Sequence, residues 1–247
     1  MSADQRRRVA TACRILAHAG LSEDVLGHVS VRVDDDTILV RARGAGECGL
    51  LFTALQDVVA CSITDPVAPP DGEHTLPNEL PIHLSCYRAD PTVGAVVHAH
   101  PPWLIAADLA GVALVPLVGA YNIPAARLAA DGIAVYPRGV LINTAELGAE
   151  MVAAMDGRPV CVLRGHGVTA TGATVEQAVA RALAVDSLAR MAARVAALSG
   201  EVRPLPPDDL AQLPDLGTRF NDELVWRHRE RLLRHAGHGI DEQGDEA

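Results

Sequence analysis

Two histidines separated by one residue, His98 and His100, have the residue type and spacing best suited to chemistry in this sequence. They follow the apolar run 93–97 and precede Pro101 and Pro102, so they lie at the end of a predicted buried strand. Side chains two residues apart on a strand point to the same side of the sheet. Two imidazoles placed in this way are typical of a metal-ligand pair, although a packed or exposed pair would show the same pattern.

A third histidine could complete the set. His166 lies between two glycines in the segment Arg164-Gly165-His166-Gly167, and glycines on both sides allow close approach of the backbone at a strand junction. Catalytic metal sites use three protein ligands and keep one position open. His98, His100 and His166 could together form such a site, whereas His166 taken alone could equally be a turn histidine.

Glu79 could supply an acid/base group beside these histidines. It follows Pro77-Asn78 at the start of a predicted helix that runs through Leu84 to Arg88, and Asn78 is predicted to cap this helix. A carboxylate in the first turn of a helix commonly stabilises the helix dipole. A metal site next to Glu79 would instead make it a candidate for proton transfer.

The elements that must position these residues follow from hydrophobic periodicity and turn residues. Helices are predicted over residues 9–17, 78–88, 103–109, 146–155, 175–199 and 222–234, and strands over residues 29–33, 38–40, 58–63, 93–97, 160–163 and 168–171. Hairpins among the strands, with helices between them, indicate a sheet layered by helices.

Length and composition favour one domain. The chain has 247 residues, of which 49% are hydrophobic, so it can bury a full core as a single domain over residues 1–247, with residues 235–247 expected to be a frayed tail. No apolar run approaches membrane length, and the polar, basic residues 1–8 are not followed by an apolar stretch of signal type. We therefore expect no membrane association.

Charge and cysteine content narrow the function further. The net charge of −10 argues against nucleic acid as a partner. The five cysteines are scattered and none forms a Cys-x-x-Cys pair. This pattern fits free buried thiols in a reducing, cytoplasmic environment.

The order of several separated motifs resembles the class II aldolase/adducin family over about residues 9–199. The motifs are Pro77-Asn78-Glu79, Ile82-His83-Leu84, Tyr87-Arg88, the segment 93–101 and Arg164-Gly165-His166-Gly167. The resemblance implies an α/β fold with three α/β/α layers and a mixed, largely antiparallel central sheet. It also implies a homo-oligomer, usually a tetramer, with active sites at subunit interfaces.

The same resemblance assigns roles to the candidate residues. His98, His100 and His166 would hold a divalent metal ion; three imidazoles suit zinc, and manganese, iron and cobalt also bind imidazole. Glu79 would match the acid/base glutamate of the family.

A tyrosine that reaches the active site of a neighbouring subunit is also implied. Tyr136 falls near that position, and Tyr121 competes with it. Either ring could instead be packed in the core with its hydroxyl satisfied.

The residues that hold phosphate in the sugar-phosphate aldolases of the family are not kept. Those enzymes have Gly-Asn, a Thr-Gly turn and a Ser-Ser pair, where this chain has Gly27-His28, the segment Arg41-Ala42-Arg43-Gly44-Ala45-Gly46-Glu47, and Pro77-Asn78. Because three hydroxyl or amide donors are missing, a phosphorylated sugar is not the expected substrate.

Cationic side chains stand in their place. Arg41 and Arg43 are two residues apart at a strand end, so they are expected to share one face and to bind a substrate carboxylate with their guanidinium groups. A solvated strand edge is the alternative for such a pair. His28 would lie near them, and Arg164, next to His166, is a further candidate for substrate binding.

Segments 27–32 and 43–51 resemble the hydroxy-aromatic decarboxylase branch of the family. This implies decarboxylation of an aromatic carboxylate, 3,4-dihydroxyphthalate to protocatechuate in phthalate catabolism, with Glu79 or a neighbour's tyrosine handling the proton. A retro-aldolase acting on an unphosphorylated hydroxy-keto acid is one alternative. A non-catalytic adducin-like binding module is another, although such modules tend to lack the ligand histidines.

Overall fold

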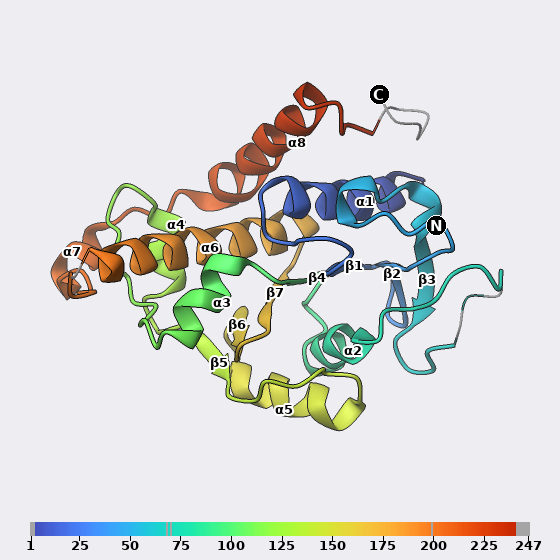
Figure 1. The fold of residues 1–247 in the computed structure, drawn as a ribbon, viewed down its shortest axis with the longest axis horizontal. Coiled ribbons are helices and arrows are strands. Elements are labelled where there is room, and N and C mark those ends of the chain that lie inside the picture. The colour runs from blue at the N-terminus through green and yellow to red at the C-terminus, as the bar shows by residue number, and fades with distance from the viewer. Residues whose placement is uncertain (1–2, 68, 70, 199, 241–247) are drawn as a thin grey trace.

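A mixed seven-stranded sheet forms the centre of the computed structural model, which describes residues 3–67, 69, 71–198 and 200–240 (Figure 1). Its strands are β1 (His28–Arg32), β2 (Thr37–Arg41), β3 (Val58–Ser62), β4 (Ala95–Ala99), β5 (Ala134–Tyr136), β6 (Val160–Leu163) and β7 (Gly167–Gly172). Their order is β3-β2-β1-β4-β7-β6-β5, and every neighbouring pair is antiparallel except β5 with β6. The predicted mixed, largely antiparallel sheet is thus confirmed.

Helices cover both faces of this sheet (Figure 1). One face is covered by α1 (Ala3–His18), α3 (Pro102–Leu109) and α6 (Val175–Ala197), and the other by α2 (Leu80–Ala89) and α5 (Ala145–Met155). Helix α8 (Val225–His235) packs outside α1 and α6, and α4 (Ile123–Leu128) packs on α6. The three-layer α/β/α arrangement is confirmed.

Alternation along the strands decides which layer each side chain meets. Val97 of β4 packs in the core under α1 and α6, whereas Val96 packs in the core under α2 and α5. Because faces alternate every residue, His98 points to the α2/α5 side, as does Ser30 of β1. The histidine strand therefore faces the helix that begins next to Glu79.

The elements that the sequence did not predict are short. Strand β5 has three residues, and α4 and α7 (Pro207–Gln212) have six each, too few to establish a hydrophobic period. The last helical segment begins earlier than predicted, as a π-helical turn over Arg219–Leu224 that leads into α8. Ser199, the predicted end of the long helix, lies outside the described residues.

Residues 238–240 are held against the fold, so the prediction of a frayed tail is wrong for these three residues, whereas residues 235–237 are exposed. The Arg14 guanidinium donates hydrogen bonds to the carbonyls of His238 and Gly239, at 3.1 and 3.2 Å. The His238 amide donates to the Leu233 carbonyl, and Ile240 packs against the core under α1. Residues 241–247 lie outside the described residues.

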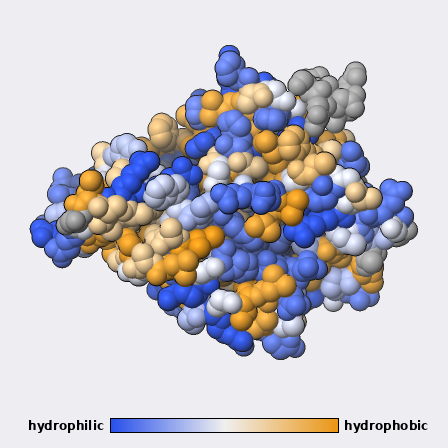
Figure 2. Space-filling model, viewed as in Figure 1, coloured by the Kyte–Doolittle hydropathy of each residue, from blue (hydrophilic) through white to orange (hydrophobic). Residues whose placement is uncertain are grey.

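The surface mixes hydrophilic side chains with apolar patches on the face shown in Figure 2. Among the described residues, no helix is long and apolar enough to cross a membrane. All five cysteines are free thiols; four are buried as predicted, and Cys48 is exposed.

Candidate active site

Four side chains converge at the end of β4. One nitrogen or carboxylate oxygen from each of Glu79, His98, His100 and His166 lies within 4.8 Å of the others. The Nε2 atoms of His98 and His100 are 2.8 Å apart. Glu79 Oε2 is 3.2 Å from His98 Nε2 and 3.4 Å from His166 Nε2. The structure therefore brings the three histidines suggested for metal binding together with Glu79, one of the candidates for proton transfer.

His98 is oriented by the neighbouring strand. It is fully buried, and its Nδ1 lies 3.1 Å from the carbonyl oxygen of Val168 at the start of β7. Because a carbonyl can only accept, His98 donates to it through a proton on Nδ1, and its Nε2 atom faces the cluster. This arrangement, a ligand nitrogen in front and a backbone acceptor behind, is the usual one for metal-binding histidine.

His166 is held by a tight turn. Gly165 has a positive φ of +60°, and a Cβ on Gly167 would lie 2.3 Å from the carbonyl oxygen of Ala99. Only glycine fits both positions. The Nδ1 atom of His166 is buried without a hydrogen-bond partner in the described part of the chain. The close approach that the two glycines predicted is therefore present.

Arg164 supports this turn instead of facing the cluster. Its Nε lies 3.0 Å from Asp108 Oδ1 on α3, and Asp108 Oδ2 accepts a hydrogen bond of 2.8 Å from the Gly165 amide. The Arg164 guanidinium thus has a partner within the fold, Asp108. The sequence predicted Arg164 as a substrate-binding residue and did not predict this ion pair.

Glu79 is the N-terminal boundary residue of α2, but its carboxylate does not cap the helix. Asn78 is therefore not the cap that was predicted. Glu79 Oε1 accepts a 3.0 Å hydrogen bond from the Ile142 amide, which turns Oε2 toward the histidines. Burial raises the pKa of this carboxyl, but hydrogen bonds with His166 and His98 outweigh burial and hold the pKa well below its ordinary value. Glu79 is therefore ionised at neutral pH.

The donor set of the cluster fits a divalent metal ion. Metal-binding imidazole must be neutral, and burial, together with the nearby His98 and His166, lowers the pKa of His100 to about 3. Three imidazoles beside one carboxylate suit a borderline cation such as zinc, with Glu79 close enough to act on whatever occupies an open position.

A second group of polar side chains lies directly behind the cluster. His28 is opposite His98 in the β1–β4 register, with ring centroids 4.9 Å apart. Its Nδ1 contacts His83 of α2, and His83 in turn contacts Ser30. No role for His83 or Ser30 was predicted from the sequence. The signal was present, because His83 is four residues after Glu79 on one helical face and Ser30 is two residues after His28 on one strand face.

Arg41 and Arg43 do not act as a pair. Arg41 is only 3% exposed and forms an ion pair with Glu47, and its charge is felt by Cys13 of α1, on the far side of the sheet from α2. The structure therefore does not place Arg41 where a substrate-binding arginine was expected, and strand alternation alone could not tell which layer Arg41 would enter.

Arg43 lies closer to the cluster. It is partly exposed beyond the end of β2, where it bridges to Thr75, and its Nη2 donates to the Val25 carbonyl at 3.2 Å. Its positive charge is among the causes that lower the pKa of His100, after burial and the neighbouring histidines. Arg43 is thus the arginine of the pair that a ligand at the histidines could meet.

The two candidate tyrosines have opposite environments. Tyr136 is 2% exposed, and its hydroxyl donates to Glu150 Oε2 at 2.9 Å within the same chain. Its hydroxyl is thus satisfied within its own chain in the α5 layer, as the alternative of a packed ring predicted. Tyr121, in the segment between α3 and α4, is 78% exposed.

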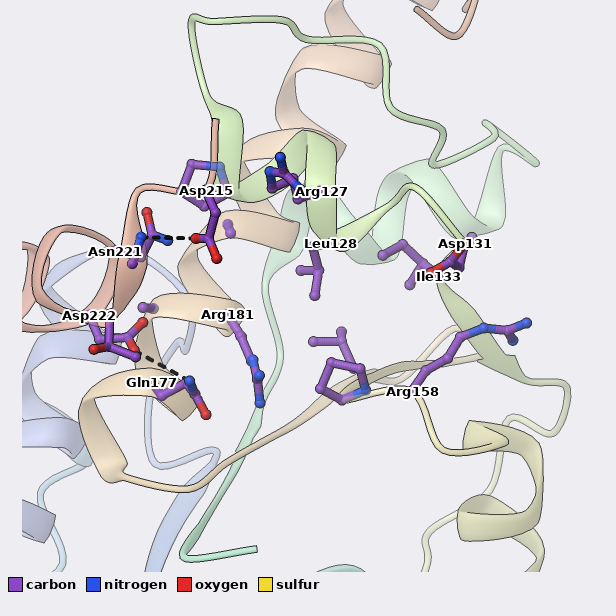
Figure 3. Close-up of a pocket in the computed structure, with 18 residues that line it drawn as sticks. Arg127, Leu128, Asp131, Ile133, Arg158, Gln177, Arg181, Asp215, Asn221 and Asp222 are labelled. Carbon is purple, nitrogen blue, oxygen red and sulfur yellow. Dashed lines mark hydrogen bonds between the residues drawn. The ribbon is translucent and has the colours of Figure 1, made fainter. Parts of the chain in front are cut away.

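A cavity of about 400 Å³ opens beside the cluster. Polar and apolar side chains share its wall, with His100 and His166 at one end and Leu26, Ile105 and Leu109 among the others. A second cavity, drawn in Figure 3, holds about 480 Å³ between α4, α6 and the π-helical turn. None of the residues that line this second cavity belongs to the histidine cluster, and its arginines face a similar number of aspartates.

This sheet, with a histidine–glutamate cluster at the end of its fourth strand, defines a class of proteins: the chain belongs to the class II aldolase/adducin family. The Class II Aldolase and Adducin N-terminal domain matches residues 7–193. A crystal structure of an aldolase II superfamily protein from Pseudomonas syringae superposes with a TM-score of 0.77 at 21% identity, covering 96% of this chain and 94% of that one. That likeness concerns the fold.

Relatives with higher sequence identity point to a more specific activity within the family. The chain is 48% identical over 229 residues to a 3,4-dihydroxyphthalate decarboxylase of Arthrobacter keyseri, covering 92% of each protein. It is 50% identical over 231 residues to a 3,4-dihydroxyphthalate decarboxylase of Terrabacter sp. (strain DBF63), covering 92% of this chain and 95% of that protein. The resemblance seen in the motifs is thus confirmed at the level of the family.

The buried histidines predict a loss of stability in mild acid. Burial, the largest cause, lowers the pKa of His28, His83 and His100, to about 3 for the last two. Unfolded histidine titrates near pH 6.5, so below that pH the unfolded chain takes up protons that the folded chain does not. Stability is therefore full above about pH 6.5 and falls as the pH drops toward 3. At about pH 5 the loss is about 2 kcal/mol each for His83 and His100.

Urea unfolding of the metal-free protein at about pH 7.5 and about pH 5 measures this loss. His83→Gln should reduce the difference between the two pH values. His235→Gln, which removes an exposed histidine at the end of α8, should leave the difference unchanged. Equal stability of the unaltered protein at both pH values would contradict the assignment of neutral buried rings.

Proposed function

We propose that this protein is a divalent-metal-dependent carboxy-lyase that converts 3,4-dihydroxyphthalate to protocatechuate and carbon dioxide. The observation that carries the proposal is the cluster of His98, His100, His166 and ionised Glu79, in a chain about half identical to proteins named for this reaction. The cluster also argues against a non-catalytic binding module. The same chemistry would serve the breakdown of phthalate.

His98, His100 and His166 would hold the metal ion, and zinc is the ion we propose. A divalent ion bound there would stabilise negative charge on the substrate hydroxyl next to the departing carboxylate. The orientation of His98 by the Val168 carbonyl supports its role as a ligand.

Glu79 would move the proton. Ionised Glu79 accepts the proton of the substrate hydroxyl and then delivers it to the ring carbon that bears the departing carboxylate, which makes a β-keto acid. The carbon–carbon bond then breaks, its electron pair restores the aromatic ring, and carbon dioxide leaves. A solvent proton finally returns to the hydroxyl oxygen, so one proton is consumed for each carbon dioxide released.

Arg43 would hold the carboxylate that the product keeps. Removing a charged hydrogen-bond donor costs about 1.5–3 kcal/mol, so Arg43→Ala should raise KM for the dicarboxylate by about 10- to 100-fold. The effect on a hydroxybenzoate with a single carboxylate should be much smaller. An equal effect on both substrates would mean that Arg43 does not bind the second carboxylate.

Arg41→Ala is the matched comparison. Because Arg41 is buried against Glu47, this change should lower the free energy of unfolding, on the order of 3 kcal/mol. KM of the folded fraction should stay near that of the unaltered protein. Denaturant unfolding and steady-state kinetics on the two variants separate support of the fold from recognition of substrate.

We also propose that the protein is a homo-oligomer, most simply the tetramer of its family. Each subunit would be a single domain, and the protein would be located in the cytoplasm. The exposed apolar side chains of Trp103, Leu109 and Tyr121, at 43, 69 and 78% exposure, support a subunit interface near the cavity. In such an assembly Tyr121 is the tyrosine available to a neighbour's site. Light scattering coupled to size exclusion measures the subunit number.

Incubation of the metal-loaded protein with 3,4-dihydroxyphthalate tests the proposed function. Protocatechuate and carbon dioxide should form in equal amounts and should stop forming when the metal is removed with a chelator. Cleavage of an unphosphorylated hydroxy-keto acid to an aldehyde, with no release of carbon dioxide from the phthalate, would instead identify a retro-aldolase.

A further inference from the structure

We propose that a buried chain of hydrogen bonds fixes His28 as a hydrogen-bond donor to the anionic substrate, and thereby prevents it from becoming a fourth histidine ligand of the metal. The chain runs from Tyr87 through Ser30 and His83 to His28. This inference rests on the proposed function for the identity of the acceptor. The state of the ring itself follows from the hydrogen bonds alone.

The chain is short and sealed. Tyr87 Oη lies 2.8 Å from Ser30 Oγ, Ser30 Oγ lies 2.6 Å from His83 Nδ1, and His83 Nε2 lies 2.6 Å from His28 Nδ1. Ser30 and His83 are fully buried, while Tyr87 is 2% and His28 is 4% exposed. Each proton in this chain must therefore find its acceptor within the protein.

The tyrosine sets the direction of the chain. Within the described part of the protein, the Tyr87 hydroxyl contacts Ser30 Oγ and the backbone amide of Val96, and that amide can only donate. A buried hydroxyl proton needs an acceptor, so Tyr87 donates to Ser30. The proton of Ser30 then has one acceptor left, the Nδ1 atom of His83.

The direction is passed on through the two imidazoles. Because His83 Nδ1 accepts, the proton of this ring is on Nε2 and is donated to His28 Nδ1. His28 must then carry its own proton on Nε2. A second proton on His28 would set two donors against each other, and a second proton on His83 would leave the Ser30 proton without an acceptor. Burial also lowers the pKa of both rings.

The free end of the chain is next to the candidate metal cluster. His28 Nε2 has no hydrogen-bond partner among the described residues, and it is not among the atoms sealed from solvent. The ring lies 4.9 Å from that of His98. An N–H group has no lone pair for a metal ion, but it can donate to a carboxylate or phenolate oxygen.

The two facing imidazoles are therefore held in opposite ways. His98 donates through Nδ1 to the Val168 carbonyl, which leaves Nε2 for a metal ion, whereas His28 accepts at Nδ1 and presents a proton on Nε2. His83, Ser30 and Tyr87 are thus positioning residues that keep the proton of His28 on Nε2.

Nitrogen-15 NMR of the zinc-loaded protein, labelled at histidine, tests the proposal directly. Two-bond nitrogen–proton correlations distinguish the tautomers, and the spectra of His28→Asn and His83→Asn assign the two rings by loss of their signals. We expect both rings to be neutral and protonated at Nε2. Protonation of His28 at Nδ1 would overturn the proposal, whatever the enzyme is found to turn over.

Metal content gives a second readout. His28→Asn should bind as much zinc as the unaltered protein and should raise KM for 3,4-dihydroxyphthalate by about 10-fold or more, as expected for loss of a donor to a charged oxygen. Loss of zinc in this variant would show that His28 is a ligand and would overturn the proposal.

Variants of the serine test whether the chain acts through His28. Ser30→Ala should give a mixture of His28 tautomers and raise KM, with zinc still bound, and Ser30→Thr, which keeps the hydroxyl, should restore the single tautomer. Ser62→Ala is the matched control, because Ser62 on β3 donates to Asp36 and is remote from the cluster. An unchanged His28 tautomer in both Ser30→Ala and Tyr87→Phe would overturn the chain as its cause.

Discussion

His98→Ala is expected to abolish metal binding and turnover together, with activity lower by about 10³-fold or more. His98 is the centre of the cluster, since its Nε2 lies 2.8 Å from His100 Nε2 and 3.2 Å from Glu79 Oε2. The two imidazoles left in the variant would hold a divalent ion weakly, and the developing charge on the substrate would lose its counterion.

Metal analysis of the purified variant and a thermal unfolding scan with and without added zinc measure the result. Zinc that binds only the folded state raises the midpoint temperature of unfolding. At a free zinc concentration of about 1,000 times Kd, the free energy of unfolding rises by about 4 kcal/mol. This rise should be absent in His98→Ala. Because His98 is fully buried, His98→Gln, with a side chain closer in volume, should be compared to separate loss of metal from loss of packing.

His228→Ala provides the matched control, because it removes an exposed histidine from α8. Its zinc content, its zinc-dependent stabilisation and its turnover should equal those of the unaltered protein. Full activity in His98→Ala, or in protein stripped of metal, would refute the proposed use of the cluster.

Local sequence signals were enough to predict that His98 and His100 face the same side of the sheet, because two residues at a strand end share a face. The glycines around His166 predicted a close approach of the backbone. That His166 joins the other two histidines was implied by the family resemblance, since the pairing of β4 with β7 brings it there.

Pairings between distant segments could not be derived in the same way. The register that sets His28 opposite His98 joins β1 to β4, and no feature of either strand alone specifies it. Arg41 is a second example. Its spacing of two residues from Arg43 was evident in the sequence, but only the positions of Glu47 and α1 show that Arg41 is buried away from the cluster.

Side-chain competition explains the remaining errors. Tyr136 is on a three-residue strand whose only parallel partner is β6, and Glu150 of α5 takes its hydroxyl. The end of the chain similarly depends on Arg14, which α1 supplies from the other end of the sequence. In both cases the decisive partner is remote in sequence, so composition alone favoured a different outcome.

Glu79→Gln is expected to lower kcat by about 10²- to 10⁴-fold, the usual contribution of a positioned acid/base group. Glutamine has nearly the shape of glutamate, and its amide oxygen can still accept the 3.0 Å hydrogen bond from the Ile142 amide. It cannot take a proton from the substrate hydroxyl or return one to the ring. The fold and the three imidazoles should stay in place, so metal content should be close to that of the unaltered protein.

Glu150→Gln is the matched control for Glu79→Gln. Glu150 binds Tyr136 and Arg138 on the α5 side of the molecule, so the same chemical change there should leave kcat near its original value. Single-turnover measurements on both variants with 3,4-dihydroxyphthalate report the chemical step without product release. If Glu79→Gln keeps its rate while Tyr121→Phe loses it, the proton is carried by a tyrosine. If Glu79→Gln loses the metal, the carboxylate is a ligand, and the open position beside the three histidines is smaller than the mechanism requires.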